Sequence, residues 1–229
     1  MEKDKQLTTS EKEPISLGDS QPLTTNLGQV GDHNTQIAHV ENYDASQQII
    51  NINYFRQSPG LDEEKFLVMQ QFSREYYQLL VTYDEKIFEN NIITFPREKV
   101  LTHNLVPDEI FERCSSLEQS GIDELKTFPA IICVENNDFS GRINPPQTAC
   151  FGYIKKVQKL RNQVKVVFEP INTFDQSKLC NQKSAAYFDL IMGPGITTLN
   201  VTAWSVHKTD VFEAFKEAGI DYIKPIQKP

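Results

Sequence analysis

Apolar residues recur at helical spacing soon after residue 60. They follow steps of three, four and seven residues, which puts them on one face of a helix: Phe66, Met69, Tyr76, Leu80, Tyr83 and Ile87. Acidic residues at 62–64 stand in the first turn, where the helix dipole favours negative charge. A second helix is predicted from Pro107, whose fixed φ suits the first helical position, to about Leu117. The first part of the folded region is therefore expected to be helical.

Shorter apolar runs farther along the chain predict strands. Residues 130–134 are an unbroken apolar run of strand length, which is typical of a buried strand. Residues 150–157 and 164–168 read as two strands on either side of the polar turn 159–163. We expect these two strands to form a hairpin.

The C-terminal part is predicted to mix helix and strand. A helix is expected at 174–190, broken by Gly193-Pro194-Gly195, and a strand is expected at 197–206. Thr209 is expected to cap a last helix that stops at Gly219.

The junction between the last strand and the last helix also contains candidate chemistry. Trp204 and Val206 share one face of the predicted strand, so we interpret them as a core anchor that leads into the capped helix. The alternative is a pocket formed by Glu135, His207 and Lys208. No reaction follows from these residues alone.

These patterns divide the chain into three parts. Residues 58–229 are predicted to form an α+β domain, with helices packed on a small, mostly antiparallel sheet or a partly open barrel. Residues 1–26 are poor in apolar side chains and mix acids and lysines with Ser, Thr, Pro and Gln, so we expect a disordered tail. Residues 27–57 differ from both neighbours.

The segment at 27–57 is rich in Asn and Gln and has strand-like periodicity. Ile50, Ile52 and Tyr54 alternate with Asn51 and Asn53, which is the period of a β-strand. No Lys or Arg occurs from residue 27 to residue 55, and Pro-Gly at 59–60 then closes the segment. We predict a β-type self-association segment ahead of the domain.

One hexapeptide in this segment, Gln29-Val30-Gly31-Asp32-His33-Asn34, resembles the core of the RIP homotypic interaction motif and of its bacterial and fungal amyloid-signalling relatives. Gly28 stands where that family usually has Ile or Val. The longer stretch is similar to Asn/Gln-rich N-terminal motifs of bacterial conflict (anti-phage) proteins. The resemblance implies stacking with copies of itself, or with a partner, as a cross-β fibril that propagates an immune or cell-death signal. The residues assigned to self-association are Gln29, Val30, Gly31, Asn34, Gln36 and Ile37.

The composition of the segment agrees with cross-β stacking. Residues 27–55 contain no Pro, and their only charged side chains besides histidine are Asp32, Glu41 and Asp44. Asn and Gln side chains can form amide ladders along a fibril, while Val30 and Ile37 can supply a dry interior. The alternative is a polar linker, or an edge strand that pairs within the domain.

Charge and cysteine usage narrow the class of protein. The 229-residue chain has a net charge of −8, which argues against bulk affinity for nucleic acid or an anionic membrane. No apolar run approaches the roughly 18 residues of a membrane helix, and the N-terminus has no apolar secretion signal. The four cysteines include no CxxC pair, so reduced thiols are expected. We expect a cytoplasmic protein without a membrane anchor.

Residue types that commonly carry catalysis are scattered. The four histidines form no HxH or HExxH pair, so neither a metal site nor a cofactor is predicted. Ser73, Ser115 and Ser205 lack a Gly-x-Ser-x-Gly elbow, which excludes an α/β-hydrolase site. The glycine-rich stretch at 193–195 is not a phosphate loop, because no Gly-Lys-Ser/Thr follows it. The sequence leaves enzymatic activity open.

Basic residues cluster in the predicted hairpin, near a single acid, Glu169. They are candidates for a small anion or nucleic-acid contact, and the alternative is a solvated hairpin face. The cluster consists of Lys155, Lys156, Lys159, Arg161 and Lys165.

Three functions remain open at this point. The first is a non-enzymatic adaptor of a bacterial anti-phage system, which forms homo-oligomers and recruits an effector protein through its N-terminal motif. The second is an effector enzyme, a hydrolase or nuclease, that clustering activates. The third is a module that binds a small ligand or nucleic acid through the basic hairpin.

Overall fold

One mixed sheet of six strands organises the domain, in the order β2-β5-β4-β3-β1-β6. The computed structural model describes residues 63–137, 146–193 and 197–222. Within the sheet, β1 and β3 run parallel and the other neighbours are antiparallel. The predicted α+β fold with a mostly antiparallel sheet is thus confirmed. The strands are β1 (Tyr77–Thr82), β2 (Ile92–Pro96), β3 (Pro129–Val134), β4 (Thr148–Lys159), β5 (Gln163–Asp175) and β6 (Ala203–His207).

Short helices surround the sheet. None of the helices in the described part of the chain is long and apolar enough to cross a membrane. The helices are α2 (Glu63–Met69), α3 (Ile87–Asn90), α4 (Asp108–Cys114), α5 (Gln119–Lys126), α6 (Gln182–Tyr187) and α7 (Val211–Glu217), with 3-10 turns η1 (Arg97–Lys99), η2 (His103–Leu105), η3 (Gln176–Leu179) and η4 (Thr198–Asn200).

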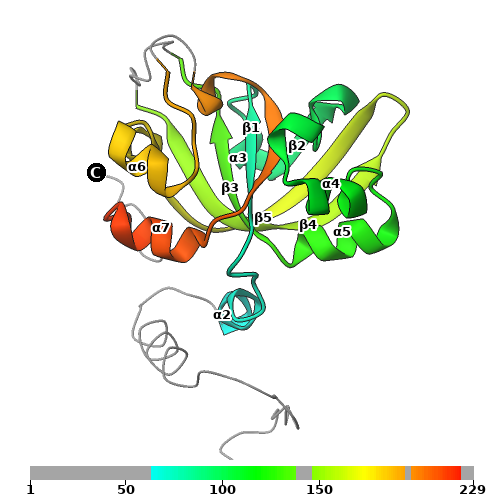
Figure 1. Ribbon diagram of the computed structural model, residues 1–229, viewed down its shortest axis with the longest axis horizontal. Helices are drawn as coiled ribbons and strands as arrows, with labels where there is room; N and C mark the ends of the chain where they lie inside the picture. Colours follow the sequence, from blue (N-terminus) through cyan, green and yellow to red (C-terminus); the bar gives the residue numbers. More distant parts are fainter. Residues whose placement is uncertain (1–62, 138–145, 194–196, 223–229) are drawn as a thin grey trace, which may run out of the picture. The chain divides into compact units, whose positions relative to one another are not determined.

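The sheet curves into a half-barrel (Figure 1). The segment after β2 reaches the outer edge of β6, where the backbone N–H of Leu101 donates to the carbonyl of Trp204 at 2.9 Å. The long β4–β5 hairpin has register shifts next to Gly152 and Lys156, and such bulges bend and twist a strand pair. A Cβ at Gly152 would collide with the backbone carbonyl of Glu169, so glycine is required at this bend.

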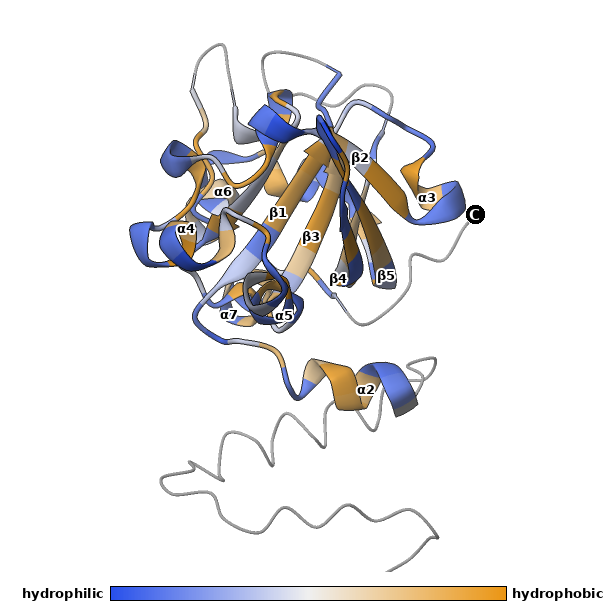
Figure 2. Cartoon of the chain, turned by 90° about the vertical axis from the view of Figure 1, so that its right-hand side faces the viewer, coloured by the Kyte–Doolittle hydropathy of each residue, from blue (hydrophilic) through white to orange (hydrophobic). Residues whose placement is uncertain are grey.

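Two apolar clusters lie on opposite faces of the sheet. The inner cluster includes Leu80 and Ile132, and Phe95 from β2 meets Trp204 from β6 across it with ring centroids 6.3 Å apart. α4 and α5 pack against this inner face, whereas α6 and α7 cover the outer face (Figure 1). Neighbouring strand residues alternate between the clusters because successive side chains of a strand point to opposite faces. Figure 2 shows the resulting hydrophobic colouring along β1 and β3.

The helix predicted to run from residue 61 toward Ile87 is wrong beyond its first turns. α2 ends at Met69, and after a turn in which the hydroxyl of Ser73 accepts from the N–H of Tyr76, β1 begins at Tyr77. Every residue of β1 is buried, because the strand lies inside the sheet with apolar clusters on both faces. A continuous apolar run of this kind fits helix and buried strand equally well by periodicity.

Other predicted elements are confirmed, some with shifted ends. The buried strand at 130–134 is β3, and the predicted hairpin is β4–β5, extended at both ends. The predicted second helix is α4, with Pro107 as its N-cap residue. β2, with Ile93 and Phe95 buried, was not predicted because the run 92–96 is short and contains a proline.

The C-terminal boundaries also differ from the prediction. The segment expected to be helical from residue 174 starts inside β5, continues as η3, and forms only one short helix, α6. β6 starts at Ala203 because η4 occupies the preceding residues. Asp210, rather than Thr209, caps the last helix: its carboxylate accepts from the N–H groups of Phe212 and Glu213. Gly219, with φ of 65°, follows the helix as predicted.

The disordered tail predicted at 1–26 and the self-association segment predicted at 27–57 lie outside the described residues.

A candidate ligand pocket at the edge of the sheet

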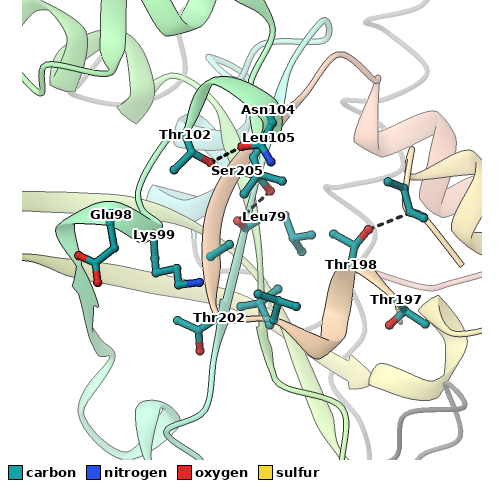
Figure 3. A pocket seen from close by; sticks show the side chains of 14 residues that line it. Leu79, Glu98, Lys99, Thr102, Asn104, Leu105, Thr197, Thr198, Thr202 and Ser205 are labelled. Atoms are coloured by element: carbon teal, nitrogen blue, oxygen red, sulfur yellow. Dashed lines mark hydrogen bonds between the residues drawn. The ribbon is translucent and has the colours of Figure 1, made fainter. Parts of the chain in front are cut away.

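A pocket of about 390 Å³ lies over the edge strand β6 and its neighbour β1 (Figure 3). Leu79 and Val81 from β1 form its floor together with Ala203 and Ser205 from β6. These side chains share one face because Leu79 pairs with Ser205 and Val81 with Ala203 in the antiparallel register. The remaining lining residues come from two segments: Glu98, Lys99, Thr102, Asn104 and Leu105 from the η1–η2 region, and Ile191, Thr197, Thr198, Val201 and Thr202 from the η4 region.

The pocket combines apolar surface with a few polar groups. Ile191 and Val201, both in its lining, are 74% and 43% exposed, so they present apolar surface to solvent. Burying an exposed Val or Ile side chain completely contributes about 1.5–3 kcal/mol, and a ligand in this pocket would gain part of that. Glu98 and Lys99 add one charge of each sign. An apolar floor with a small number of polar groups is typical of ligand sites.

A buried amide network supports the η4 side of the pocket. Gln176, fully buried, donates to the carbonyl of Val134 at 2.7 Å and to Oδ1 of Asn136 at 2.8 Å. Asn136 donates to Oγ1 of Thr197 at 3.4 Å, and Thr197 donates to Oδ1 of Asn200 at 2.7 Å. The pocket wall at η4 is therefore tied to the end of β3.

Glu135 fixes the start of β6. One of its carboxylate oxygens accepts from the N–H of Thr202 at 2.6 Å and from the hydroxyl of Thr202 at 2.5 Å. His207 lies at the other end of β6, and five residues of strand span roughly 16 Å. The alternative of a pocket formed by Glu135, His207 and Lys208 is therefore wrong, because the length of β6 separates the first residue from the other two. The preferred interpretation of Trp204 and Val206 as a core anchor is confirmed, because both side chains are buried.

A chain of three polar side chains begins at the pocket floor. The hydroxyl of Ser205 lies 3.0 Å from Nε2 of His207, and Nδ1 of His207 lies 3.3 Å from Oδ2 of Asp189. The His207 ring stacks on the Tyr77 ring with centroids 5.1 Å apart. Ser205 is also 3.4 Å from the carbonyl of Leu79. Ser205 as a whole residue is 2% exposed and lines the pocket.

Lys208 belongs to a separate ionic cluster. Its ammonium lies 3.0 Å from Glu109 and 3.5 Å from Glu75. The Tyr76 hydroxyl donates to the Glu109 carboxylate at 2.7 Å. This hydrogen bond, together with Lys208, lowers the pKa of Glu109 to about 2. Burial and the bond to Glu109 raise the pKa of Tyr76, so the phenol stays protonated. The cluster links the residues just before β1, the helix α4 and the residue just after β6.

The basic cluster predicted in the hairpin is partly neutralised. Lys155 pairs with Glu169 at 3.1 Å, and this pairing raises the pKa of Lys155. Lys159 pairs at 3.0 Å with Glu118. Glu118 is 41 residues away in sequence, so the sequence alone does not predict this ion pair. Of the other members of the cluster, Lys156 and Arg161 are exposed and Lys165 is half-buried.

The four cysteines are free thiols. Cys114, Cys133 and Cys150 are buried, and Cys180 is half-buried. Burial raises the pKa of Cys114 and of Cys150 to about 12, so these thiols stay protonated. They act as core side chains.

Sequence reasoning found only part of this arrangement. Ser205 lies in the strand predicted at 197–206, but His207 lies one residue beyond its predicted end, so the sequence prediction does not pair the two side chains. Ser205 lacks the nucleophile elbow of an α/β-hydrolase, and nothing in the sequence connects Asp189 with it. The residues predicted to self-associate lie outside the described part of the chain: Gln29, Val30, Gly31, Asn34, Gln36 and Ile37.

Comparison of the chain with protein-family models, with curated proteins and with solved structures finds no match.

Proposed function

We propose that the chain is a signalling adaptor of a bacterial anti-phage (conflict) system, which self-assembles through residues 27–57 and binds a ligand or partner effector through its folded domain. The observation that carries this proposal is the motif Gln29-Val30-Gly31-Asp32-His33-Asn34 in a stretch, residues 27–55, that contains no proline, lysine or arginine. Its resemblance to amyloid-signalling motifs supplies the link to immune signalling.

Physical chemistry supports assembly by this segment. Stacked strands place identical side chains in register. A charged side chain in the stack would therefore repel its own copies, whereas Asn and Gln side chains form hydrogen bonds with theirs. Three acids in the whole stretch from residue 27 to residue 55 keep that repulsion low. Assembly of many chains would bring many copies of the folded domain together around the stack. These copies would bind a multivalent partner with higher avidity than a single domain.

The pocket supports a binding role for the folded domain. Ile191 and Val201 expose apolar surface beside a floor made by two strands, and a bound ligand or peptide would remove that surface from water. The basic hairpin is the weaker candidate for a docking site, because Lys155 and Lys159 already have carboxylate partners. Nucleic acid is for the same reason the less favoured partner.

The assembly test compares the full chain with two single variants. Gln29→Asp places a charge in the motif, and Gln21→Asp makes the same change in the preceding tail as a matched control. Light scattering with thioflavin-T fluorescence should show assembly of the wild-type chain and of Gln21→Asp, and loss of assembly in Gln29→Asp. A wild-type chain that stays monomeric and dye-silent after prolonged agitation would refute the proposal.

A further inference from the structure

Ser205, which lines the pocket, begins a hydrogen-bonded chain that continues through His207 to Asp189. Ser205 and His207 stand two residues apart in β6, so both side chains lie on the same face of the sheet. Asp189, which follows α6, reaches the far side of the imidazole. The distances are 3.0 Å from the Ser205 hydroxyl to Nε2 of His207 and 3.3 Å from Nδ1 of His207 to Asp189.

The carboxylate determines which imidazole nitrogen carries the proton. An ionised carboxylate only accepts hydrogen bonds, so Asp189 favours the neutral tautomer of His207 with the proton on Nδ1. Nε2 is then left with a lone pair directed at the Ser205 hydroxyl. The other acceptor within reach of that hydroxyl, the carbonyl of Leu79, is farther away at 3.4 Å. Ser205 therefore donates to His207, which is the arrangement of a serine activated by a base.

Tyr77 contacts His207 and also the residue before Asp189. The Tyr77 ring stacks on the imidazole of His207 at an interplanar angle of 19°. Its hydroxyl donates at 2.5 Å to the carbonyl of Phe188, the residue before Asp189. Tyr77 is fully buried, and burial raises its pKa well above the ordinary value, so this hydroxyl remains a donor. Asp189 itself has φ of 54°, a left-handed conformation that Asp tolerates better than most residues.

We propose that Ser205 is a nucleophile that cleaves carboxylic esters or thioesters of small apolar acyl groups bound in the pocket, with His207 as its general base and Asp189 as a positioning residue. Leu79, Val81 and Ala203 form an apolar floor beside the hydroxyl that suits such an acyl chain. This activity goes beyond the proposed adaptor function and corresponds to an effector role.

The reaction balances with water as the second substrate. The Ser205 oxygen attacks the acyl carbonyl carbon while its proton passes to Nε2 of His207. The bond to the alcohol or thiol then breaks, and the leaving group takes that proton. Water next attacks the acyl-serine, giving one proton to His207, and the carboxylic acid departs as Ser205 regains its proton.

The test uses the full-length protein and a fluorophosphonate probe, followed by mass spectrometry of the modified peptide. One probe adduct is expected on Ser205 in the wild-type chain. Ser205→Ala should lose the adduct, whereas Ser184→Ala, a matched change at another buried serine with a hydrogen-bond partner, should keep it. Failure to label Ser205 in the folded wild-type chain would overturn the proposal, as would equal ester hydrolysis by Ser205→Ala.

Asp189→Asn tests the hydrogen-bonded chain without depending on a core substitution, because the Asp189 side chain is 70% exposed. The amide removes the charge that selects the Nδ1 proton. Hydrolysis of a p-nitrophenyl butyrate probe should lose roughly 100-fold or more in kcat, with a much smaller change in KM. Equal kcat in this variant and the wild-type chain would overturn the three-residue assignment. These outcomes are independent of the assembly test, because all three variants leave residues 27–57 unchanged.

Discussion

Replacing Gln176 by leucine tests whether a buried side-chain amide completes the edge of β3. β4 pairs with β3 through residues 129–132, so none of the strands in the described part of the chain lies beside Val134 on that side. Gln176 takes that place: its Oε1 accepts from the N–H of Val134 at 3.3 Å, and its Nε2 donates to the carbonyl of Val134 at 2.7 Å. The same Nε2 donates to Asn136 at 2.8 Å.

The magnitude follows from the groups that lose their partner. Leucine has nearly the volume of glutamine, so the change leaves little cavity, but the N–H and carbonyl of Val134 become buried without hydrogen bonds. Each such group costs about 1–3 kcal/mol, which predicts that Gln176→Leu lowers the free energy of unfolding by about 2–6 kcal/mol. Domains of this size are typically stable by about 5–15 kcal/mol, so the loss is a large fraction of the total.

Urea unfolding monitored by tryptophan fluorescence measures the loss. Trp204 is the single tryptophan of the chain and is fully buried, so its emission reports on the core. Gln182→Leu makes the same exchange at an exposed position in α6 and should change stability by less than about 0.5 kcal/mol. A loss below about 1 kcal/mol in Gln176→Leu would refute the reasoning. Hydrogen exchange at 197–202 should also become faster, because Asn136 loses its orienting partner.

Three further predictions follow from other sites. Gly152→Ala should lower the free energy of unfolding by at least about 3 kcal/mol, because the added methyl group meets the backbone of β5. Gly219→Ala adds its methyl group in open space at φ of 65° and should lower that free energy by only about 1–2 kcal/mol. Thermal unfolding of both variants measures the difference. Titration of the native protein with a thiol reagent should modify Cys180 first, since it is the least buried of the four thiols, and Cys180→Ser should remove that phase. The carboxyl of Glu109 should titrate near pH 2 by NMR, and Tyr76→Phe should raise its pKa. Because the pKa of Glu109 is lowered on folding, its stabilising contribution is present above the unfolded value of about 4.3 and is lost as the pH falls toward 2.

The sequence predicts those elements well whose pattern of apolar and polar residues fits only one type of secondary structure. The β4–β5 hairpin has apolar residues on both sides of a polar turn, and β3 is an apolar run too short for a core helix. The helix predicted across β1 failed for a physical reason. Strands buried on both faces have no alternation of apolar and polar residues. Tyr76 and Leu80, four residues apart, share a face in a helix and also in a strand, and both belong to the inner cluster.

The sequence by itself determined which segments are apolar enough to fold, where the hairpin turns, and that residues 27–57 differ in composition from the domain. It also placed Trp204 and Val206 on one buried face, because strand periodicity is local. Only the tertiary structure decided that Asp189 and Tyr77 meet His207, that Gln176 completes β3, and that Glu118 neutralises Lys159. These contacts join residues far apart in the chain, and their geometry depends on the curvature and strand order of the whole sheet, which no local pattern of one chain specifies.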